Sequence, residues 1–403
     1  MKRAFRRKNA ISVAVAILLI LSMVACQGKQ VIEEPESSAD FSGQPVSPAE
    51  VQPAEDTAAL YELAKAEGQV VIYSVSSRIS AFQEDFEKTY PGISVEAYKL
   101  KTGDIITKVK TEKDAGNVNA DVVYTRDISG AMKIDFMANG YLNSYLPGDI
   151  QEKMYEPFKS NADTAIGYVE LRTIFYNTDA YPDGSPIQNW WDLTTDEWRG
   201  RLIMQDPLLI SDTMDLFMAF SQHSDEMAAA YKLKFGEDLA LSEGCKDAGY
   251  EFVKRLLAND PVLMSSEGDC TTAVGLSKEA KAPVAIAVSS KMRDAIDDGM
   301  PMAIAYDVEP VTSVIYPTYL YVAEDAPHPN AAKLLIWYMA GGADGKTEGS
   351  IAYQTDGGYP ARSDIPIVGE GQPPLSELKL WEYDAPYYYR NQNEMRDFWL
   401  SIQ

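Results

Sequence analysis

Four short segments place hydroxyl side chains next to charged residues, each directly after a stretch that is typical of a buried strand. Hydroxyl groups, helix N-termini and Arg or Lys side chains bind phosphate and carboxylate groups well, so these segments predict a site for an anion. Each Ser or Thr can instead serve only as a helix N-cap. The candidate ligand-binding residues are Ser76, Ser77 and Arg78; Thr125 and Arg126; Ser211, Asp212 and Thr213; and Ser289, Ser290 and Lys291.

A second set of residues suits a cationic ligand. Tyr176 and Tyr306 could supply aromatic walls, and Asp307 and Glu309 could supply acidic ones, which leaves a polyamine or thiamine as an alternative to an anion. Tyr176 and Tyr306 are therefore also candidate ligand-binding residues.

The stretch "APYYYRNQ" puts three tyrosines, Tyr387 to Tyr389, before Arg390 and raises the question of a ferric site built from phenolates. Neighbouring rings point in different directions in a strand or a helix, so we interpret the run as packing against the rest of the chain. The two histidines, His223 and His328, stand in no ligand-like cluster. We therefore expect no resident metal site.

The sequence offers little for catalysis. "AGGADGKT" at 340–347 is one residue from a phosphate-binding loop, but Ala340 stands where Gly is required and the segment follows a predicted helix rather than a strand. No zinc-helix motif, nucleophile elbow or cysteine–histidine arrangement occurs. We expect a protein that is not an enzyme and needs no cofactor.

The elements that must position these residues alternate regularly. "LYELAKAEG", "ISAFQEDFEKTY" and "DIITKVKTEKDAG" have helical spacing, and "QVVIYS", "ISVEAYKL" and "DVVYTR" are extended and rich in β-branched residues. Such alternation predicts an α/β fold with a mostly parallel sheet covered on both faces. Two uninterrupted extended stretches, Ile166 to Asn177 and Pro317 to Ala323, predict crossovers between two domains.

The N-terminus has the pattern of a secretory signal: five basic residues precede an apolar run from Ile11 to Val24. It ends in "SMVAC", which resembles a lipobox, so Cys26 is the expected lipidation site, with an ordinary signal peptide as the alternative. Residues 27 to 56 are rich in Pro, Ser, Glu and Gln and are expected to be a disordered tether.

The formal net charge of −24 argues against nucleic acid and anionic membrane surfaces as partners. Cys245 and Cys270 both stand in polar, Gly-containing stretches. Outside the cell such a pair is a disulfide candidate, with two unrelated free thiols as the alternative.

Seven motifs occur in order between Leu60 and Asp364: "VVIYSVSSR", "FEKTYPGISVEAY", "ADVVY", "FYNTDAY", "WWDLTTDEWRGRLIMQDP", "HPNAAKLLIWYM" and "GGYPARSDI". Together they resemble the extracellular solute-binding proteins of ABC importers, in the subfamily that includes ferric-ion, thiamine, polyamine, phosphonate and sugar-phosphate binders. Ferric binders of that subfamily place adjacent tyrosines after the strand that here reads "VAIAV", where this chain has Ser289, Ser290 and Lys291.

The resemblance implies a two-lobed, type II periplasmic-binding-protein-like fold, with two open mixed sheets joined by crossover strands and a ligand cleft between them. The expected division is a signal peptide at 1–25, the acylated Cys26 with its tether at 26–56, lobe one at 57–168 plus 318–356, and lobe two at 169–317 plus 357–403.

The function that this implies is capture of a small solute by closure of the cleft and delivery to an ABC permease, which is served by separate ATPase subunits. We expect a phosphonate, sugar phosphate or carboxylate first, a cationic metabolite second and ferric iron third. The expected protein is a monomer held by its lipid on the extracellular face of the membrane, or on the periplasmic side if the cell has an outer membrane. A surface enzyme and an adhesin remain the rival classes.

Overall fold

The computed structural model describes residues 53–76, 78–209 and 211–403, without the side chains of residues 128, 211 and 212. The predicted signal peptide, Cys26 and most of the predicted tether lie outside these residues. The described chain begins before the expected boundary at residue 57. The N–H of Gly148 donates to the carbonyl of Pro53 at 3.2 Å, and the hydroxyl of Tyr145 donates to Glu55. The last part of the expected tether is therefore packed on the folded chain.

Helices and strands alternate along the chain. The α-helices are α1 Thr57–Glu67, α2 Ile79–Thr89, α3 Thr102–Asp114, α4 Gly148–Gln151, α5 Phe158–Asn161, α6 Ser211–Gln222, α7 Ser224–Phe235, α8 Ala248–Ala258, α9 Glu267–Gly275, α10 Lys291–Asp297, α11 Pro329–Met339, α12 Glu348–Ile351 and α13 Ala385–Ser401. Short 3₁₀ or π segments are η1 Ile128–Gly130, η2 Met132–Phe136, η3 Trp190–Thr194, η4 Asp196–Trp198 and η5 Leu375–Glu377. The strands are β1 Gln69–Ser74, β2 Ser94–Lys99, β3 Val122–Arg126, β4 Leu142–Asn143, β5 Ala165–Asn177, β6 Leu202–Gln205, β7 Val262–Met264, β8 Val284–Val288, β9 Met302–Ile304, β10 Ser313–Ala323 and β11 Leu380–Trp381.

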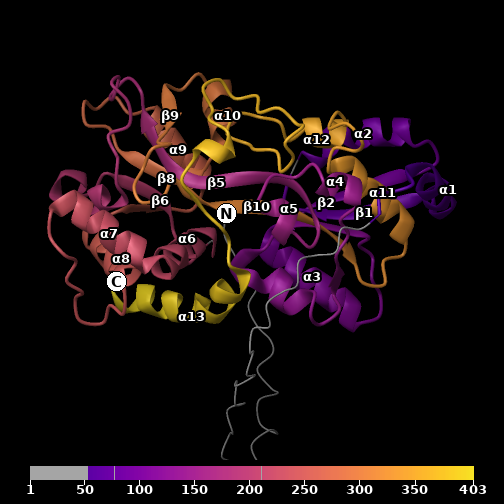
Figure 1. Cartoon of the computed structure of the whole chain (residues 1–403), viewed down its shortest axis with the longest axis horizontal. Coiled ribbons are helices and arrows are strands. Elements are labelled where there is room, and N and C mark those ends of the chain that lie inside the picture. Colours follow the sequence, from indigo (N-terminus) through magenta and orange to yellow (C-terminus); the bar gives the residue numbers. More distant parts are fainter. Residues whose placement is uncertain (1–52, 77, 210) are drawn as a thin grey trace, which may run out of the picture. The chain divides into compact units, whose positions relative to one another are not determined.

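The predicted α/β class is confirmed, with one correction to the sheet. The strands form a single hydrogen-bonded sheet of 11 strands in the order β2-β1-β3-β10-β5-β8-β6-β7, with β4 and β11 attached to β10 and β9 attached to β5. Two sheets joined by crossovers were expected. The long antiparallel strands β5 and β10 pair with each other as well as with strands on either side, and so they make the sheet continuous (Figure 1).

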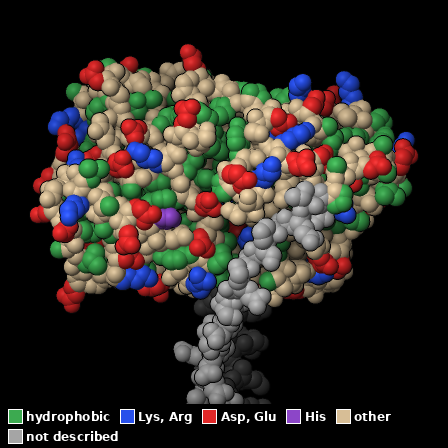
Figure 2. All heavy atoms as spheres, in the orientation of Figure 1, with side chains coloured by type: hydrophobic (Ala, Val, Ile, Leu, Met, Phe, Trp, Pro, Cys, Tyr) green, Lys and Arg blue, Asp and Glu red, His purple; other side chains and the backbone are tan. Residues whose placement is uncertain are grey.

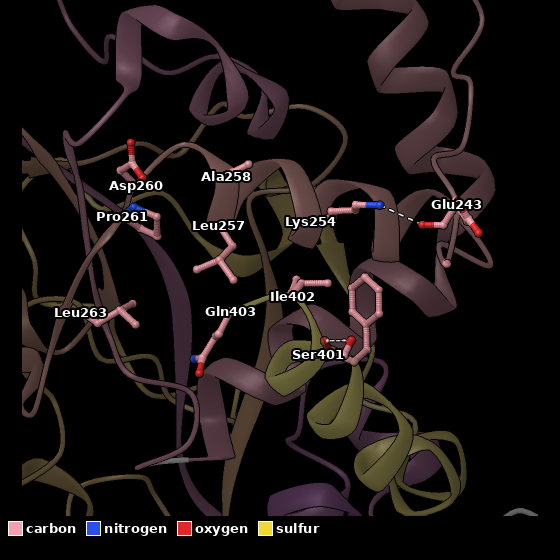
Figure 3. A pocket seen from close by; sticks show the side chains of 12 residues that line it. Glu243, Lys254, Leu257, Ala258, Asp260, Pro261, Leu263, Ser401, Ile402 and Gln403 are labelled. Atoms are coloured by element: carbon pink, nitrogen blue, oxygen red, sulfur yellow. Dashed lines mark hydrogen bonds between the residues drawn. The ribbon is translucent and has the colours of Figure 1, made fainter.

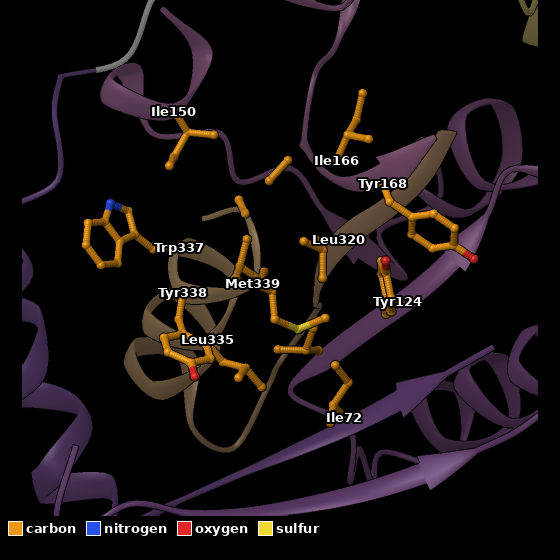
Figure 4. Packing of buried hydrophobic residues seen from close by; sticks show 14 of the residues in the cluster. Ile72, Tyr124, Ile150, Ile166, Tyr168, Leu320, Leu335, Trp337, Tyr338 and Met339 are labelled. Atoms are coloured by element: carbon orange, nitrogen blue, oxygen red, sulfur yellow. The ribbon is translucent and has the colours of Figure 1, made fainter. Parts of the chain in front are cut away.

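Two large hydrophobic cores lie along this sheet. The first core is formed by buried residues from two parts of the chain, between Leu60 and Leu171 and between Ile315 and Ala361. In it, α1, α2 and α11 pack on the strands. Figure 4 shows Leu335 and Met339 of α11 on the side of Ile72 and Leu320. The ring of Tyr338 packs against Phe82 and Phe86 of α2. The second core collects residues from Ile174 to Tyr316 and from Trp381 to Trp399.

Smaller clusters cover the opposite face of each part of the sheet. Val71 and Tyr73 of β1 face Ile105 and Val109 of α3 on the far side of the strand from Ile72. In the same way Phe175 of β5 packs with α9 and α10, whereas Ile174 belongs to the second core. Strands buried on both faces read as continuous apolar runs, which is why "VVIY" and "VAIAV" were recognisable in the sequence.

Figure 2 shows acidic side chains spread over the visible face and intermixed with Lys and Arg, without a gathered basic patch on that face. Of the helices in the described residues, none combines the length and apolar character needed to span a bilayer.

Candidate ligand site between the two cores

One face of β5 carries the polar residues around which the candidate site is built. Side chains alternate across a strand, so Tyr168, Glu170 and Arg172 share a face. Glu170 and Arg172 are almost completely buried, at 2% and 1% exposure. They stand where β5 passes between the cores, since Leu171 belongs to the first core and Ile174 to the second. Buried charged residues need hydrogen-bonding or oppositely charged partners.

Glu170 has partners from both sides. Its Oε2 accepts a hydrogen bond from Nη2 of Arg126, the last residue of β3, and one from the hydroxyl of Tyr168 at 3.1 Å. Its Oε1 accepts from the hydroxyl of Ser290, which directly precedes α10. Two predicted ligand residues, Arg126 and Ser290, therefore meet on one carboxylate that the sequence analysis did not single out.

Arg172 makes the second buried ion pair of this strand face. Its Nη1 lies 2.6 Å from Oε1 of Glu267 at the start of α9 and 3.5 Å from the hydroxyl of Thr213 in α6. The longer contact is at the limit of a hydrogen bond. Thr213, a predicted ligand residue, is itself fully buried.

Arg78 lies over a stack of tyrosines rather than against a carboxylate. Its Nη1 donates to the carbonyl of Ala352 at 3.3 Å, and its guanidinium carbon lies 5.9 Å from the ring centroid of Tyr353. The ring of Tyr353 stacks on that of Tyr168 at 5.0 Å, and Tyr124 lies beside both. Figure 4 shows the neighbouring rings of Tyr124 and Tyr168. Burial raises the pKa of all three phenols above their usual range, so they stay neutral.

Several of the predicted hydroxyl groups form hydrogen bonds with backbone groups of the chain itself. The Ser76 hydroxyl accepts from the N–H of Arg78 at 3.2 Å, and that of Thr125 donates to the carbonyl of Arg126 at 3.3 Å. The Ser289 hydroxyl accepts from the N–H of Leu171 at 3.0 Å and donates to the carbonyl of Gly357. These hydroxyls bond to the chain itself, but none of them is the N-cap of a helix, which was the alternative to ligand contact.

The remaining candidates are dispersed. Lys291 forms an ion pair with Asp294 at 2.9 Å, one turn along α10. Tyr176 is buried in the second core, and Tyr306 is half-buried against the α9–α10 cluster. Ser211 and Asp212 open α6. Ser77 lies outside the described residues. The sequence analysis missed Glu170, Arg172 and Glu267, although two charges in an otherwise apolar strand were a usable signal for the first two.

A second polar contact joins the two cores at the turn after β3. Ser129 and Gly130 have φ of 52° and 73°. The N–H and hydroxyl of Ser129 donate to the buried carboxylate of Asp215 in α6, at 3.2 and 3.0 Å. The N–H of Gly130 donates to the hydroxyl of Tyr383 at 2.7 Å. We call Ser129 and Gly130 the bridging turn.

Two of the three tyrosines in the run, Tyr387 and Tyr388, pack against the second core. The run opens α13, where Tyr388 is fully buried in the second core and stacks on Tyr383 at 4.5 Å. The hydroxyl of Tyr387 donates to Ser221 at 3.0 Å, and Tyr389 is exposed. Within the described residues no group of three or more His, Cys, Asp or Glu is placed to hold a metal ion.

The disulfide prediction is wrong. Cys245 and Cys270 are both free and buried. Cys245 lies in the second core, whereas Cys270 lies in α9, in the cluster on the other face of the sheet. The segment at 340–347 follows α11, as expected for a helix end and not for a nucleotide-binding loop.

A separate groove lies at the C-terminus, between the end of α8, β7 and the end of α13. Leu257, Leu263 and Ile402 contribute to it, and Lys254 at its edge donates to the carbonyl of Glu243 at 2.8 Å (Figure 3). It shares no residue with the network around Glu170.

Comparisons with known proteins agree on the kind of molecule. A family model described as bacterial extracellular solute-binding protein matches residues 81–369. No curated protein matches the chain. The fold matches solved structures of periplasmic binding proteins.

Iron-bound HitA from Pseudomonas aeruginosa is 17% identical to this chain with a TM-score of 0.61, and the match covers 83% of this chain and 99% of HitA. AfuA from Actinobacillus pleuropneumoniae, solved with fructose-6-phosphate, is 18% identical with a TM-score of 0.60, covering 83% and 98%. The periplasmic binding protein P5PA is 17% identical, with a TM-score of 0.61 and 83% and 99% coverage. At these identities the likeness is one of fold.

Proposed function

Because the chain belongs to the family of bacterial extracellular solute-binding proteins, we propose that it captures a small solute between two lobes and delivers it to an ABC permease. The observation that carries this proposal is the network around Glu170, in which Arg126 from the side of the first core and Ser290 from the side of the second meet on one carboxylate. A ligand at this place contacts both lobes and biases them toward closure.

The proposed lobes follow the two cores in most of their residues. Lobe one comprises residues 57–168 and 318–356, and lobe two comprises 169–317 and 357–403. All residues of the second core and most of the first fall on the expected sides, which supports this division. Five residues of the first core fall in lobe two instead: Val169, Leu171, Ile315, Tyr359 and Ala361. Since β5 and β10 continue through both, the lobes would move by bending and twisting a paired ribbon rather than by swinging on loops.

The proposed solute is an anion: a phosphonate, a sugar phosphate or a carboxylate. Arg78 and Arg126 are its proposed partners in lobe one, and Thr213 and Ser290 in lobe two. A polyamine or thiamine is less well supported, because Asp307 and Glu309 are already paired with Lys379 at 2.9 and 2.7 Å. Iron with a companion anion stays third, since the tyrosine run is packed in α13.

We further propose that the chain performs no chemistry of its own. It acts as a monomer anchored through the lipid on Cys26, and its permease obtains energy from ATPase subunits on the other side of the membrane.

Screening of a metabolite panel by thermal shift identifies the solute, because a ligand at a hundred times its Kd adds about 2.7 kcal/mol to stability. Calorimetry then compares Arg78→Ala and Arg126→Ala with Tyr388→Phe. Loss of one charge-assisted contact weakens binding about tenfold to a hundredfold. The tyrosine variant should bind as the wild type does. A large loss at Tyr388 with none at either arginine would overturn the proposed site and favour iron.

A further inference from the structure

The Glu170 carboxylate lies at the position where the proposed site would hold the anionic group of a ligand. Both of its oxygens are used, one by the Arg126 guanidinium and the Tyr168 phenol, the other by the Ser290 hydroxyl. A guanidinium and a hydroxyl from opposite sides are the contacts expected of a bound carboxylate or phosphate. Here the protein supplies that group from its own central strand.

The charge of Arg126 is thereby neutralised before any solute arrives. A monocarboxylate entering the site would make the same bonds that Glu170 already makes, and it would leave Glu170 buried without them. A buried carboxylate that loses its donors costs free energy, so such an exchange is unfavourable. An anion with a third acceptor oxygen can form one bond more than Glu170 does, and this gain offsets the loss of the resident contact.

We propose that Glu170 is a specificity-determining residue: an internal carboxylate that occupies the anion position of the site and selects against anions that offer only two acceptor oxygens, such as a monocarboxylate. The inference rests on the proposed function, since it concerns the same site. It assigns to Glu170 a role beyond holding Arg126 in place.

The test is rescue by external anions. In Glu170→Gln the charge is removed and the shape is kept, so Arg126 loses its ion pair with Glu170. The probes are sodium acetate and inorganic phosphate at constant ionic strength, with chloride as the reference salt. The readouts are the melting temperature and the apparent Kd from its dependence on anion concentration. We expect both anions to bind Glu170→Gln about tenfold to a hundredfold more tightly than the wild type. We also expect the wild type to respond to phosphate but not to acetate.

The matched control is Glu251→Gln. Glu251 is also a buried carboxylate, its Oε1 lies 2.6 Å from Nε of Arg255, and it belongs to α8 in the second core. This variant loses an ion pair of the same kind away from the proposed site. Its response to acetate and phosphate should equal that of the wild type. Equal responses of the two Gln variants would overturn the role of Glu170, because the rescue would then follow any broken pair.

If Glu170→Gln does not fold, Glu170→Asp replaces it. The charge is kept, but the shorter side chain withdraws the carboxylate from one of its partners, and phosphate should bind several-fold more tightly than to the wild type. Phosphate affinity equal to that of the wild type would contradict the proposal. If the anions stabilise Glu170→Gln but the wild type binds no metabolite, the proposed solute capture is refuted and the role of Glu170 stands. If the wild type binds a metabolite but the anions do not stabilise Glu170→Gln, only the role of Glu170 is refuted.

Discussion

Asp127 directly follows Arg126 and is the most perturbed carboxyl group near the candidate site. It is buried, its Oδ1 accepts from the N–H of Met132 at 2.8 Å, and Asp163 adds like charge nearby. Burial, the main cause, raises its pKa from 3.8 to about 7. The folded protein therefore holds a proton on Asp127 at a pH where the unfolded chain has lost it.

The sign of the pH dependence follows. The contribution of the protonated Asp127 to the free energy of unfolding is fully present below about pH 4, and it is lost as the pH rises toward 7. We predict that the stability of the wild type relative to Asp127→Asn falls by roughly 4 kcal/mol over that interval. Urea unfolding at several pH values measures it, with the exposed Asp183→Asn as control. A difference that does not change with pH would contradict the prediction.

The two thiols give a second prediction. Burial raises the pKa of Cys245 to about 11 and that of Cys270 to about 12, so neither is a reactive thiolate in the folded protein at pH 8. In a Cys26→Ser variant, a thiol reagent should find no reactive group in the native protein. It should find two groups after unfolding without reductant. Fewer than two would revive the disulfide.

Among the site residues, the sequence predicted those at the carboxyl ends of strands and not those in the middle of a strand. Arg126 and Ser290 were found because loops at the carboxyl ends of strands are the usual place for ligands. Glu170 and Arg172 were missed because the stretch around them was interpreted only as a crossover. The disulfide failed for a related reason: the spacing of two cysteines along the chain says nothing about the face of the sheet on which each one lies.

Among the secondary-structure elements, the bridging turn packs tightly against the start of α13. A Cβ on Gly130 would lie 2.2 Å from the carbonyl oxygen of Ala385, the first residue of α13, whereas a Cβ on Gly140 would meet nothing within 4 Å. The two glycines have similar φ, 73° and 67°. Gly140→Ala therefore reports the backbone strain alone, and Gly130→Ala reports the same strain plus the clash.

We predict that Gly130→Ala is less stable than Gly140→Ala by about 1–3 kcal/mol, the usual range for overpacking. Denaturant midpoints of both variants measure the difference. Equal midpoints would mean that α13 shifts freely from the turn, and the bridging turn would then be no firm contact between the two cores.

Most elements of the first part of the chain could be predicted, because apolar runs and amphipathic spacing mark them clearly. The predicted stretch at 166–177 is β5, and that at 317–323 is the second half of β10. The joining of two expected sheets into one was not predictable from periodicity, which gives the face of a strand but not its neighbours. The tail from Leu380 to Ser401, which contacts the bridging turn and packs in the second core, also gave no such signal.

For the molecule as a whole, we predict that Cys26 anchors it. Cys26→Ala should release the protein into the medium or leave its signal peptide uncleaved, because a single segment carries both the processing site and the lipid. Membrane fractionation with immunoblotting measures this, and Cys245→Ala serves as the control. Normal processing with unchanged membrane retention would contradict the prediction.

The uneven distribution of tryptophan has an optical consequence. Of six tryptophans, Trp190, Trp191, Trp198, Trp381 and Trp399 belong to the second core, and only Trp337 belongs to the first. Most of the intrinsic fluorescence of this protein therefore comes from tryptophans of the second core, and Trp337 is the single tryptophan that reports on the first core. In Trp337→Phe all emission would come from the second core. Any difference between its unfolding curve by fluorescence and that by circular dichroism would show the two halves melting at separate denaturant concentrations.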